Sequence, residues 1–222
     1  RGSYCCEINK YYLFSDFSEE SGFSLVADDF KRDIKNYNQI VFIPSCPIAS
    51  EVTDRYVEKY LEWFERIGIY FNSKVVLDNR INSEKMIDAI NNASLIYLMG
   101  GTTPLQMKFL LDNHLFNAMR NVDCLIMGLS AGAINMAEDS ILTMTCGHDK
   151  QEIYKGLGIV DKSVEPHFIL ENYNDELKKL SYNCSIYAMC DESAIIIRDI
   201  QCGYYGDIYL LKDGNIKKLK SL

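Results

Sequence analysis

Apolar and polar positions along the chain form two kinds of segment. Short apolar runs alternate with longer segments in which apolar residues recur every three or four positions. The first kind predicts strands that are buried on both faces, and the second predicts amphipathic helices. Strands are expected at Tyr11–Phe14, Gln39–Pro44, Val75–Leu77, Leu95–Leu98 and Asp123–Met127, and helices at Ser24–Tyr37, Glu51–Ile67, Ser83–Asn91 and Pro104–Met119.

Buried strands that alternate with helices predict an α/β fold, with a mostly parallel central sheet and helices on both of its faces. Beyond residue 130 the strands follow one another more closely, at Ile141–Thr145, Ser185–Met189, Ala194–Arg198 and Tyr205–Lys212. Asp213-Gly214 and the run Ile216–Leu219 then predict a C-terminal β-hairpin. No repeat or low-complexity linker interrupts the sequence, so we expect residues 1–222 to form a single domain.

The balance of charges restricts the possible partners. The chain has 23 basic and 31 acidic residues and a net charge of −8. Without a basic patch to neutralise phosphates, we expect neither nucleic acid nor a membrane surface as a partner. A signal-peptide pattern and a run of 18 apolar residues are both missing from the sequence, so we expect a soluble protein of the cytoplasm.

The cysteines and histidines do not have the spacing of a metal site. The chain has three histidines and no Cys-x-x-Cys pair; its cysteines are Cys5, Cys6, Cys46, Cys124, Cys146, Cys184, Cys190 and Cys202. We therefore expect no structural metal and no cofactor. Cysteines inside apolar runs, such as Cys124, are typical of proteins from a reducing compartment.

The sequence Gly128-Leu129-Ser130-Ala131-Gly132 directly follows the apolar run 124–127. A strand that ends in Gly-x-Ser-x-Gly and passes into a helix is typical of a nucleophile elbow, in which a tight turn exposes the serine hydroxyl. A glycine turn that contains a serine by chance is the alternative interpretation. The small residues that begin the following helix favour the elbow, so Ser130 is the candidate nucleophile of a serine hydrolase.

A second glycine loop, Gly100-Gly101-Thr102-Thr103-Pro104, follows the strand at 95–98. Thr103 is a candidate N-cap, with Pro104 at the first helical position and Gln106 completing a capping box. Acyl transfer needs two donors for the oxyanion, and the amides of Ala131 and of Gly100 or Gly101 are the candidates. A well-capped helix without a catalytic role is the alternative interpretation of this loop.

A serine nucleophile needs a base, and the chain has three histidines. We expect His114 to lie within a helix and His148 in a solvated loop. His167 follows Pro166 at the end of an extended segment, where the proline restricts the backbone, so His167 is the candidate base. The pair Asp191-Glu192 follows the strand at 185–189 and supplies the candidate carboxylates that would orient the imidazole. Turn acids without a catalytic role are the alternative.

These segments together resemble a known family. Gly-Leu-Ser-Ala-Gly-Ala at 128–133, Met-Gly-Gly-Thr-Thr at 99–103 and Glu-Pro-His-Phe at 165–168 are similar to dipeptidase E, the aspartyl dipeptidase family of serine peptidases, to which cyanophycinase is related. The resemblance implies a class I glutamine amidotransferase-like fold, a Ser130, His167 and Glu192 triad, and oxyanion donors at Gly101 and Ala131. Gly100 and Thr102 would then contact the substrate.

The resemblance implies the serine peptidase chemistry, but not the preference for aspartate. Aspartyl dipeptidases use an arginine downstream of the histidine to bind the aspartate carboxylate, and residues 169–176 contain none. The main hypothesis is a serine peptidase that cleaves short peptides. The alternatives are a cyanophycinase-like or other amide or ester hydrolase on the same fold, and a catalytically silent binding module. The oligomeric state stays open.

Overall fold

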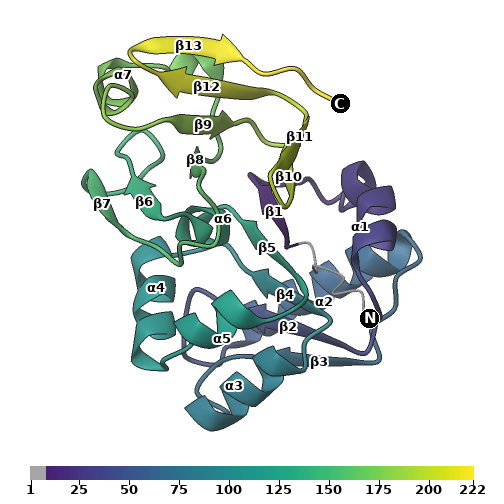
Figure 1. Cartoon of the computed structure of the whole chain (residues 1–222). Coiled ribbons are helices and arrows are strands. Elements are labelled where there is room, and N and C mark those ends of the chain that lie inside the picture. The colour runs from purple at the N-terminus through teal and green to yellow at the C-terminus, as the bar shows by residue number, and fades with distance from the viewer. Residues whose placement is uncertain (1–8) are drawn as a thin grey trace, which may run out of the picture.

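The computed structural model describes residues 9–222, so Cys5 and Cys6 lie outside the described residues. A seven-stranded sheet forms the centre, in the order β11-β10-β1-β5-β4-β2-β3 (Figure 1). Its strands are β1 (Lys10–Phe14), β2 (Gln39–Ile43), β3 (Ser73–Val76), β4 (Leu95–Leu98), β5 (Leu125–Leu129), β10 (Ala194–Arg198) and β11 (Gln201–Tyr205). The five strands from β1 to β3 in this order pair in parallel, and β10 and β11 join antiparallel. The expected parallel sheet is confirmed.

Helices cover both faces of this sheet, as the sequence predicts (Figure 1). On one face lie η1 (Ser24–Val26), α1 (Ala27–Asp33) and α2 (Glu51–Arg66). On the other lie α3 (Ser83–Asn91), α4 (Thr103–Asp112), α5 (Phe116–Asn121) and α6 (Ala131–Met136). The first face is aromatic, with Phe23 in contact with both Trp63 and Phe64, and the second is mainly aliphatic. No helix within residues 9–222 has both the length and the apolar character needed to cross a membrane.

A smaller four-stranded sheet, in the order β13-β12-β9-β8, packs with α7 beyond the carboxyl edge of the central sheet (Figure 1). Its strands are β8 (Ser163–Glu165), β9 (Ile186–Met189), β12 (Ile208–Lys212) and β13 (Asn215–Lys218). Beside it lie the pair β6 (Asp139–Leu142) and β7 (Glu152–Lys155), together with η2 (Leu170–Asn172) and α7 (Asp175–Leu180). The C-terminal hairpin is confirmed: β12 and β13 turn at Asp213-Gly214, where both residues have positive φ.

The sequence missed three breaks in regular structure. The helix expected to run from 104 to 119 ends at Asp112 and restarts at Phe116, because His114 adopts a left-handed φ of 56°. The Leu115 amide then donates to the Leu110 carbonyl, as in a Schellman C-cap. The strand expected at 205–212 is two strands separated by Gly206 at φ 73°, and the helix expected at 24–37 ends at Asp33. His114 therefore caps a helix instead of lying within one.

Candidate active site

The carboxyl ends of the parallel strands meet at one edge of the central sheet, where ligands bind in open α/β folds. Ser130 follows β5 at this edge, and its amide donates to the Phe14 carbonyl at the end of β1, at 2.9 Å. The residues that follow β1 therefore lie directly beside Ser130. The loop after β4 approaches from the other side, since a Cβ added to Gly100 would lie 3.6 Å from the Ser130 Cβ.

Ser130 has the backbone geometry of a nucleophile elbow. Its φ of 54° and ψ of −110° lie outside the helical region, and α6 begins at the next residue. Side chains would not fit two positions before or after it: a Cβ at Gly128 would lie 2.5 Å from the Gly132 carbonyl carbon, and one at Gly132 would lie 2.1 Å from the Leu98 carbonyl oxygen. Close packing of strand against helix thus explains both glycines of the Gly-x-Ser-x-Gly sequence.

The structure places His167 against this serine. The His167 Nε2 lies 2.8 Å from the Ser130 Oγ, within hydrogen-bonding distance. His167 follows Pro166 and has a left-handed φ of 57°, and the next residue, Phe168, is buried in the core of the smaller sheet. The Phe168 amide donates to the Met189 carbonyl at 2.9 Å. The backbone is therefore held on both sides of the imidazole.

The carboxylate that meets the imidazole belongs to Asp191, whose Oδ1 lies 2.9 Å from the His167 Nδ1. Glu192, the acid implied by the family resemblance, instead accepts a hydrogen bond from the Ser18 amide at 2.6 Å. The topology explains the meeting of His167 and Asp191. Because β8 and β9 are parallel neighbours, the residues that follow them emerge side by side. Glu192 has a left-handed φ of 62°, and its side chain leaves in another direction.

Hydrogen bonding shifts the ionisation of this pair. The bond to Asp191 raises the pKa of His167 above its ordinary value, although partial burial opposes the shift. The bond from His167 lowers the pKa of Asp191, and a hydrogen bond from Ser15 lowers it further. When the His167 Nδ1–H donates a hydrogen bond to Asp191, the unprotonated Nε2 is left as the acceptor that faces the Ser130 hydroxyl. The arrangement can take a proton from Ser130 and stabilise the resulting imidazolium.

A second carboxyl group, Glu165, lies two residues before His167 and is 4% exposed. The Thr143 hydroxyl lies 2.8 Å from each of its oxygens. Burial raises the pKa of Glu165 to about 7, the neighbouring Glu176 acts in the same direction, and the hydrogen bond from Thr143 opposes the shift. The hydrogen-bond partner of its carboxyl group is Thr143 and not Ser130, so Glu165 supports the loop that carries His167.

Ser15 is the site residue that the sequence did not reveal. It follows β1, donates to the Asp191 Oδ1 at 2.7 Å and accepts from the His167 amide at 2.7 Å. Ser15 lies outside any recognisable motif, and its distance from Asp191 in the chain is 176 residues. The pairing of β1 with β5 brings Ser15 beside Ser130, and the pairing of β1 with β10 brings it beside Asp191; neither pairing can be found from hydrophobic periodicity.

The loop after β4 faces the elbow and begins α4. Gly101 has a φ of 127°, and a Cβ there would lie 2.0 Å from the Ser45 Oγ, so glycine is required. The N-cap of α4 is Thr102, not Thr103, and its side chain makes no capping hydrogen bond. The expected capping box is therefore wrong.

Gln106 instead belongs to a buried network beneath this loop. Its Nε2 donates at 3.0 Å to the carbonyls of Ile43 and Met99, which end two neighbouring strands. Its Oε1 accepts from the Asn135 Nδ2 at 3.0 Å, and the Asn135 Oδ1 accepts from the Tyr154 hydroxyl. The network connects α4 and α6 to the strand ends on either side of the loop, and so holds Gly100 and Gly101 beside the elbow.

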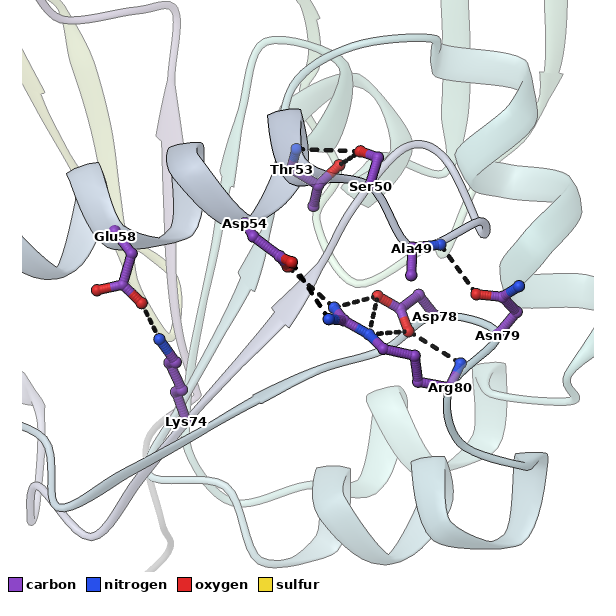
Figure 2. Close-up of polar contacts among 9 residues, drawn as sticks. All are labelled: Ala49, Ser50, Thr53, Asp54, Glu58, Lys74, Asp78, Asn79 and Arg80. Carbon is purple, nitrogen blue, oxygen red and sulfur yellow. Dashed lines mark hydrogen bonds and ion pairs between the residues drawn. The ribbon is translucent and has the colours of Figure 1, made fainter.

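Polar contacts also hold the loop that follows β2, which carries Ser45 (Figure 2). The Asn79 amide donates to the Pro47 carbonyl at 2.8 Å, and the Asn79 Oδ1 accepts from the Ala49 amide at 2.9 Å. The Arg80 guanidinium pairs with the buried Asp78 and with Asp54 on α2. This cluster ties the loop to β3 and α2, and it explains how Ser45 is kept against Gly101.

An open pocket of about 410 Å³ lies next to this loop, lined by residues that include Gly101, Thr102 and His148. The His148 Nδ1 lies 3.1 Å from the Thr143 carbonyl oxygen, and its Nε2 lies 3.4 Å from the Thr103 hydroxyl. His148 thus lines the pocket, while the imidazole at Ser130 is that of His167. Within residues 9–222, no group of three or more His, Cys, Asp or Glu side chains is arranged to hold a metal ion.

Comparison with known proteins shows the family and supports the fold of this chain. The model of peptidase family S51 matches residues 13–203. The crystal structure of a peptidase from an acI-B1 Actinobacterium has a TM-score of 0.69 at 18% identity, and the match covers 96% of this chain and 95% of that one. The crystal structure of a provisionally named peptidase E protein from Listeria monocytogenes EGD-e has a TM-score of 0.64 at 22% identity, and the match covers 96% of this chain and 100% of that one. Both structures share the fold. No curated protein sequence matches the chain.

Proposed function

We propose that this chain, which belongs to peptidase family S51 and is a serine-type peptidase, hydrolyses short peptides through an acyl-enzyme formed on Ser130. The observation that carries the proposal is a pair of linked hydrogen bonds. The Ser130 Oγ lies 2.8 Å from the His167 Nε2, and the His167 Nδ1 lies 2.9 Å from the Asp191 Oδ1. It combines a partly exposed nucleophile, a base in contact with it and a carboxylate that orients the base.

In the proposed reaction, the His167 Nε2 takes the hydroxyl proton while the Ser130 Oγ attacks the carbonyl carbon of the scissile amide. The resulting oxyanion would accept hydrogen bonds from the amide of Ala131, the residue after the nucleophile, and from that of Gly101, whose neighbour Gly100 lies beside Ser130. His167 then donates its proton to the leaving amine, and the C–N bond breaks. Water, activated by the same imidazole, hydrolyses the ester and restores Ser130.

Asp191 takes the orienting role that the family resemblance gives to Glu192. Its carboxylate contacts the imidazole, whereas the Glu192 carboxylate accepts from the Ser18 amide. The negative charge of Asp191 stabilises the imidazolium that forms as Ser130 attacks, and the hydrogen bond at Nδ1 sets the tautomer that leaves Nε2 as the acceptor. The proposed triad is therefore Ser130, His167 and Asp191.

We infer a peptide substrate from the family, and the pocket of about 410 Å³ beside Gly101, the proposed oxyanion donor, has room for part of a short peptide. The segment after His167 carries no arginine between residues 169 and 176, and exposes Ile169 and Leu170 instead. A preference for aspartate is therefore not part of the proposal. A cytoplasmic location is part of it, since all six cysteines of the described chain are free thiols.

The test is labelling by a fluorophosphonate probe, combined with hydrolysis of a dipeptide panel, for the wild type and Ser130→Ala. The panel contains Asp-Leu, a β-aspartyl-arginine dipeptide and neutral dipeptides. We expect the wild type to be labelled at Ser130 and to cleave at least one dipeptide, and the variant to lose both activities while keeping its circular dichroism spectrum. Labelling or hydrolysis that survives the substitution would refute the assignment of the nucleophile. A wild type inert in both assays would favour a binding protein.

A further inference from the structure

We infer that Ser15 is a positioning residue of this site, and that it fixes the orientation of Asp191 relative to His167. The inference rests on the proposed function. Ser15 is 0% exposed and lies one residue after the end of β1. Its hydroxyl donates to the Asp191 Oδ1 and accepts from the His167 backbone amide, both at 2.7 Å. One hydroxyl therefore contacts both partners of the ion pair without touching the reacting atoms.

The oxygen that Ser15 contacts is the one that matters for the base. The Asp191 Oδ1 accepts from the Ser15 hydroxyl and also lies 2.9 Å from the His167 Nδ1. The Asp191 side chain is 56% exposed, so solvent competes for its oxygens and packing alone does not select a rotamer. The buried hydroxyl supplies the missing constraint, because it holds Oδ1 on the side that faces the imidazole.

The second contact of Ser15 explains how the imidazole itself is held. The left-handed φ of 57° at His167 takes its amide out of any strand ladder, and the Ser15 Oγ accepts that N–H. The two hydrogen bonds of Ser15 thereby set the separation between the His167 backbone and the Asp191 carboxylate. A residue of the same volume without a hydroxyl would leave the His167 amide unpaired and Oδ1 free to turn.

The neighbours of Ser15 hold the backbone on which this geometry depends. The Glu192 amide donates to the Asp16 carbonyl at 2.8 Å, and the Ser18 amide donates to the Glu192 carboxylate. The segment 15–18 is thus bonded to residues 191–192 at three points, of which only the Ser15 bond reaches the triad carboxylate. Glu192 belongs to this backbone clamp, which accounts for its place beside the site without a contact to His167.

The experiment measures the second-order rate of labelling of Ser130 by a fluorophosphonate probe as a function of pH, for the wild type, Ser15→Ala and Ser181→Ala. Ser181 is the matched control: it is also buried, accepts from a backbone amide (Gly214, 3.0 Å) and donates to an acceptor (the Lys178 carbonyl, 2.6 Å), but lies next to α7. Ser15→Cys, which keeps the volume and weakens the donor, is measured beside Ser15→Ala in case the alanine variant does not fold.

Labelling requires neutral His167, so its rate falls as pH decreases through the pKa of that imidazole. Without the Ser15 hydroxyl, the Asp191 Oδ1 is free to turn away from the imidazole, so the carboxylate stabilises the imidazolium less. We therefore expect the acid limb of Ser15→Ala to move to lower pH by about half a unit, and labelling at pH 7 to be slowed by about tenfold because the base is no longer held in its orientation. Ser15→Cys should change in the same direction by less, and Ser181→Ala should keep the wild-type profile.

Two outcomes separate failure of this inference from failure of the proposed function. If Ser130 is labelled but the pH profile of the Ser15 variants coincides with that of Ser181→Ala or moves to higher pH, Ser15 does not position Asp191 and the inference is wrong. If the wild type is not labelled at Ser130 at any pH, the proposed function itself fails.

Discussion

The assignment of the orienting acid is tested by exchanging a carboxylate for an amide at two adjacent positions. Asp191→Asn removes a negative charge 2.9 Å from the His167 Nδ1, whereas Glu192→Gln removes one whose hydrogen-bond partner is the Ser18 amide. Both substitutions preserve side-chain size. Any difference between the two variants therefore reports which charge acts on the imidazole.

The size of the effect follows from the distance and the exposure. Because the Asp191 side chain is 56% exposed, an effective dielectric constant of about 40, between that of a protein surface and that of water, is appropriate. At 2.9 Å the attraction between the carboxylate and the imidazolium is then about 3 kcal/mol, which corresponds to about a 10²-fold loss of rate. Glu192→Gln keeps an oxygen acceptor for the Ser18 amide, so we expect less than about a threefold change.

The assay is kcat/KM for whichever dipeptide of the panel is cleaved, with fluorophosphonate labelling as a second measure and thermal unfolding as the control for folding. The two variants should differ by about two orders of magnitude in both assays. A large loss in Glu192→Gln together with a nearly unchanged Asp191→Asn would refute the reasoning. That result would restore the triad implied by the family resemblance.

Three further predictions concern pH and stability. Asp191 raises the pKa of His167, so kcat/KM should fall as pH decreases through a value above the ordinary 6.5. Asp191→Asn should move this acid limb of the pH profile to lower pH, and a profile that does not respond to the substitution would contradict the assignment. Glu165, whose folded-state pKa of about 7 exceeds its unfolded value, contributes stability that is complete below pH 4 and is lost as pH rises through 7. Glu165→Gln should therefore raise the melting temperature relative to wild type at pH 8, with a gain in the free energy of unfolding of up to about 3 kcal/mol, and should have little effect at pH 4. Equal effects at both pH values would exclude this linkage. Gln106→Leu leaves the Ile43 and Met99 carbonyls without their buried donor and should lower the free energy of unfolding by about 3 kcal/mol in a urea titration, while an unchanged midpoint would show that the network does not hold the loop.

The sequence predicted the central sheet well because buried parallel strands produce continuous apolar runs. The strands at 39–43 and 95–98 were found almost to the residue. Two of the three breaks were missed because each depends on a single left-handed residue, His114 or Gly206, and a histidine is a type of residue that periodicity arguments treat as helical. At the third, the backbone turns extended at Ile34, which the apolar pattern does not reveal. The short strand β7 was also missed, since four residues produce too little pattern.

The site was predicted from the sequence to the extent that its residues belong to local motifs. Ser130 and His167 were found from the turn that each occupies, and the structure places them 2.8 Å apart. The choice between Asp191 and Glu192 depends on one left-handed φ angle at Glu192, which composition does not encode. The place of Ser15 depends on the pairing of β1 with β5 and with β10, contacts between segments more than 100 residues apart.

The four residues of the proposed site and its support are widely separated along the chain. Ser15 comes early, Ser130 lies near the middle, and His167 and Asp191 come late, each at the end of a different strand. During synthesis the nucleophile therefore leaves the ribosome well before its base and its carboxylate, and β8 and β9 must pair before these two meet. A nascent chain that ends before Asp191 cannot assemble the proposed triad, so in the proposed mechanism folding of the late strands is the step that completes the active site.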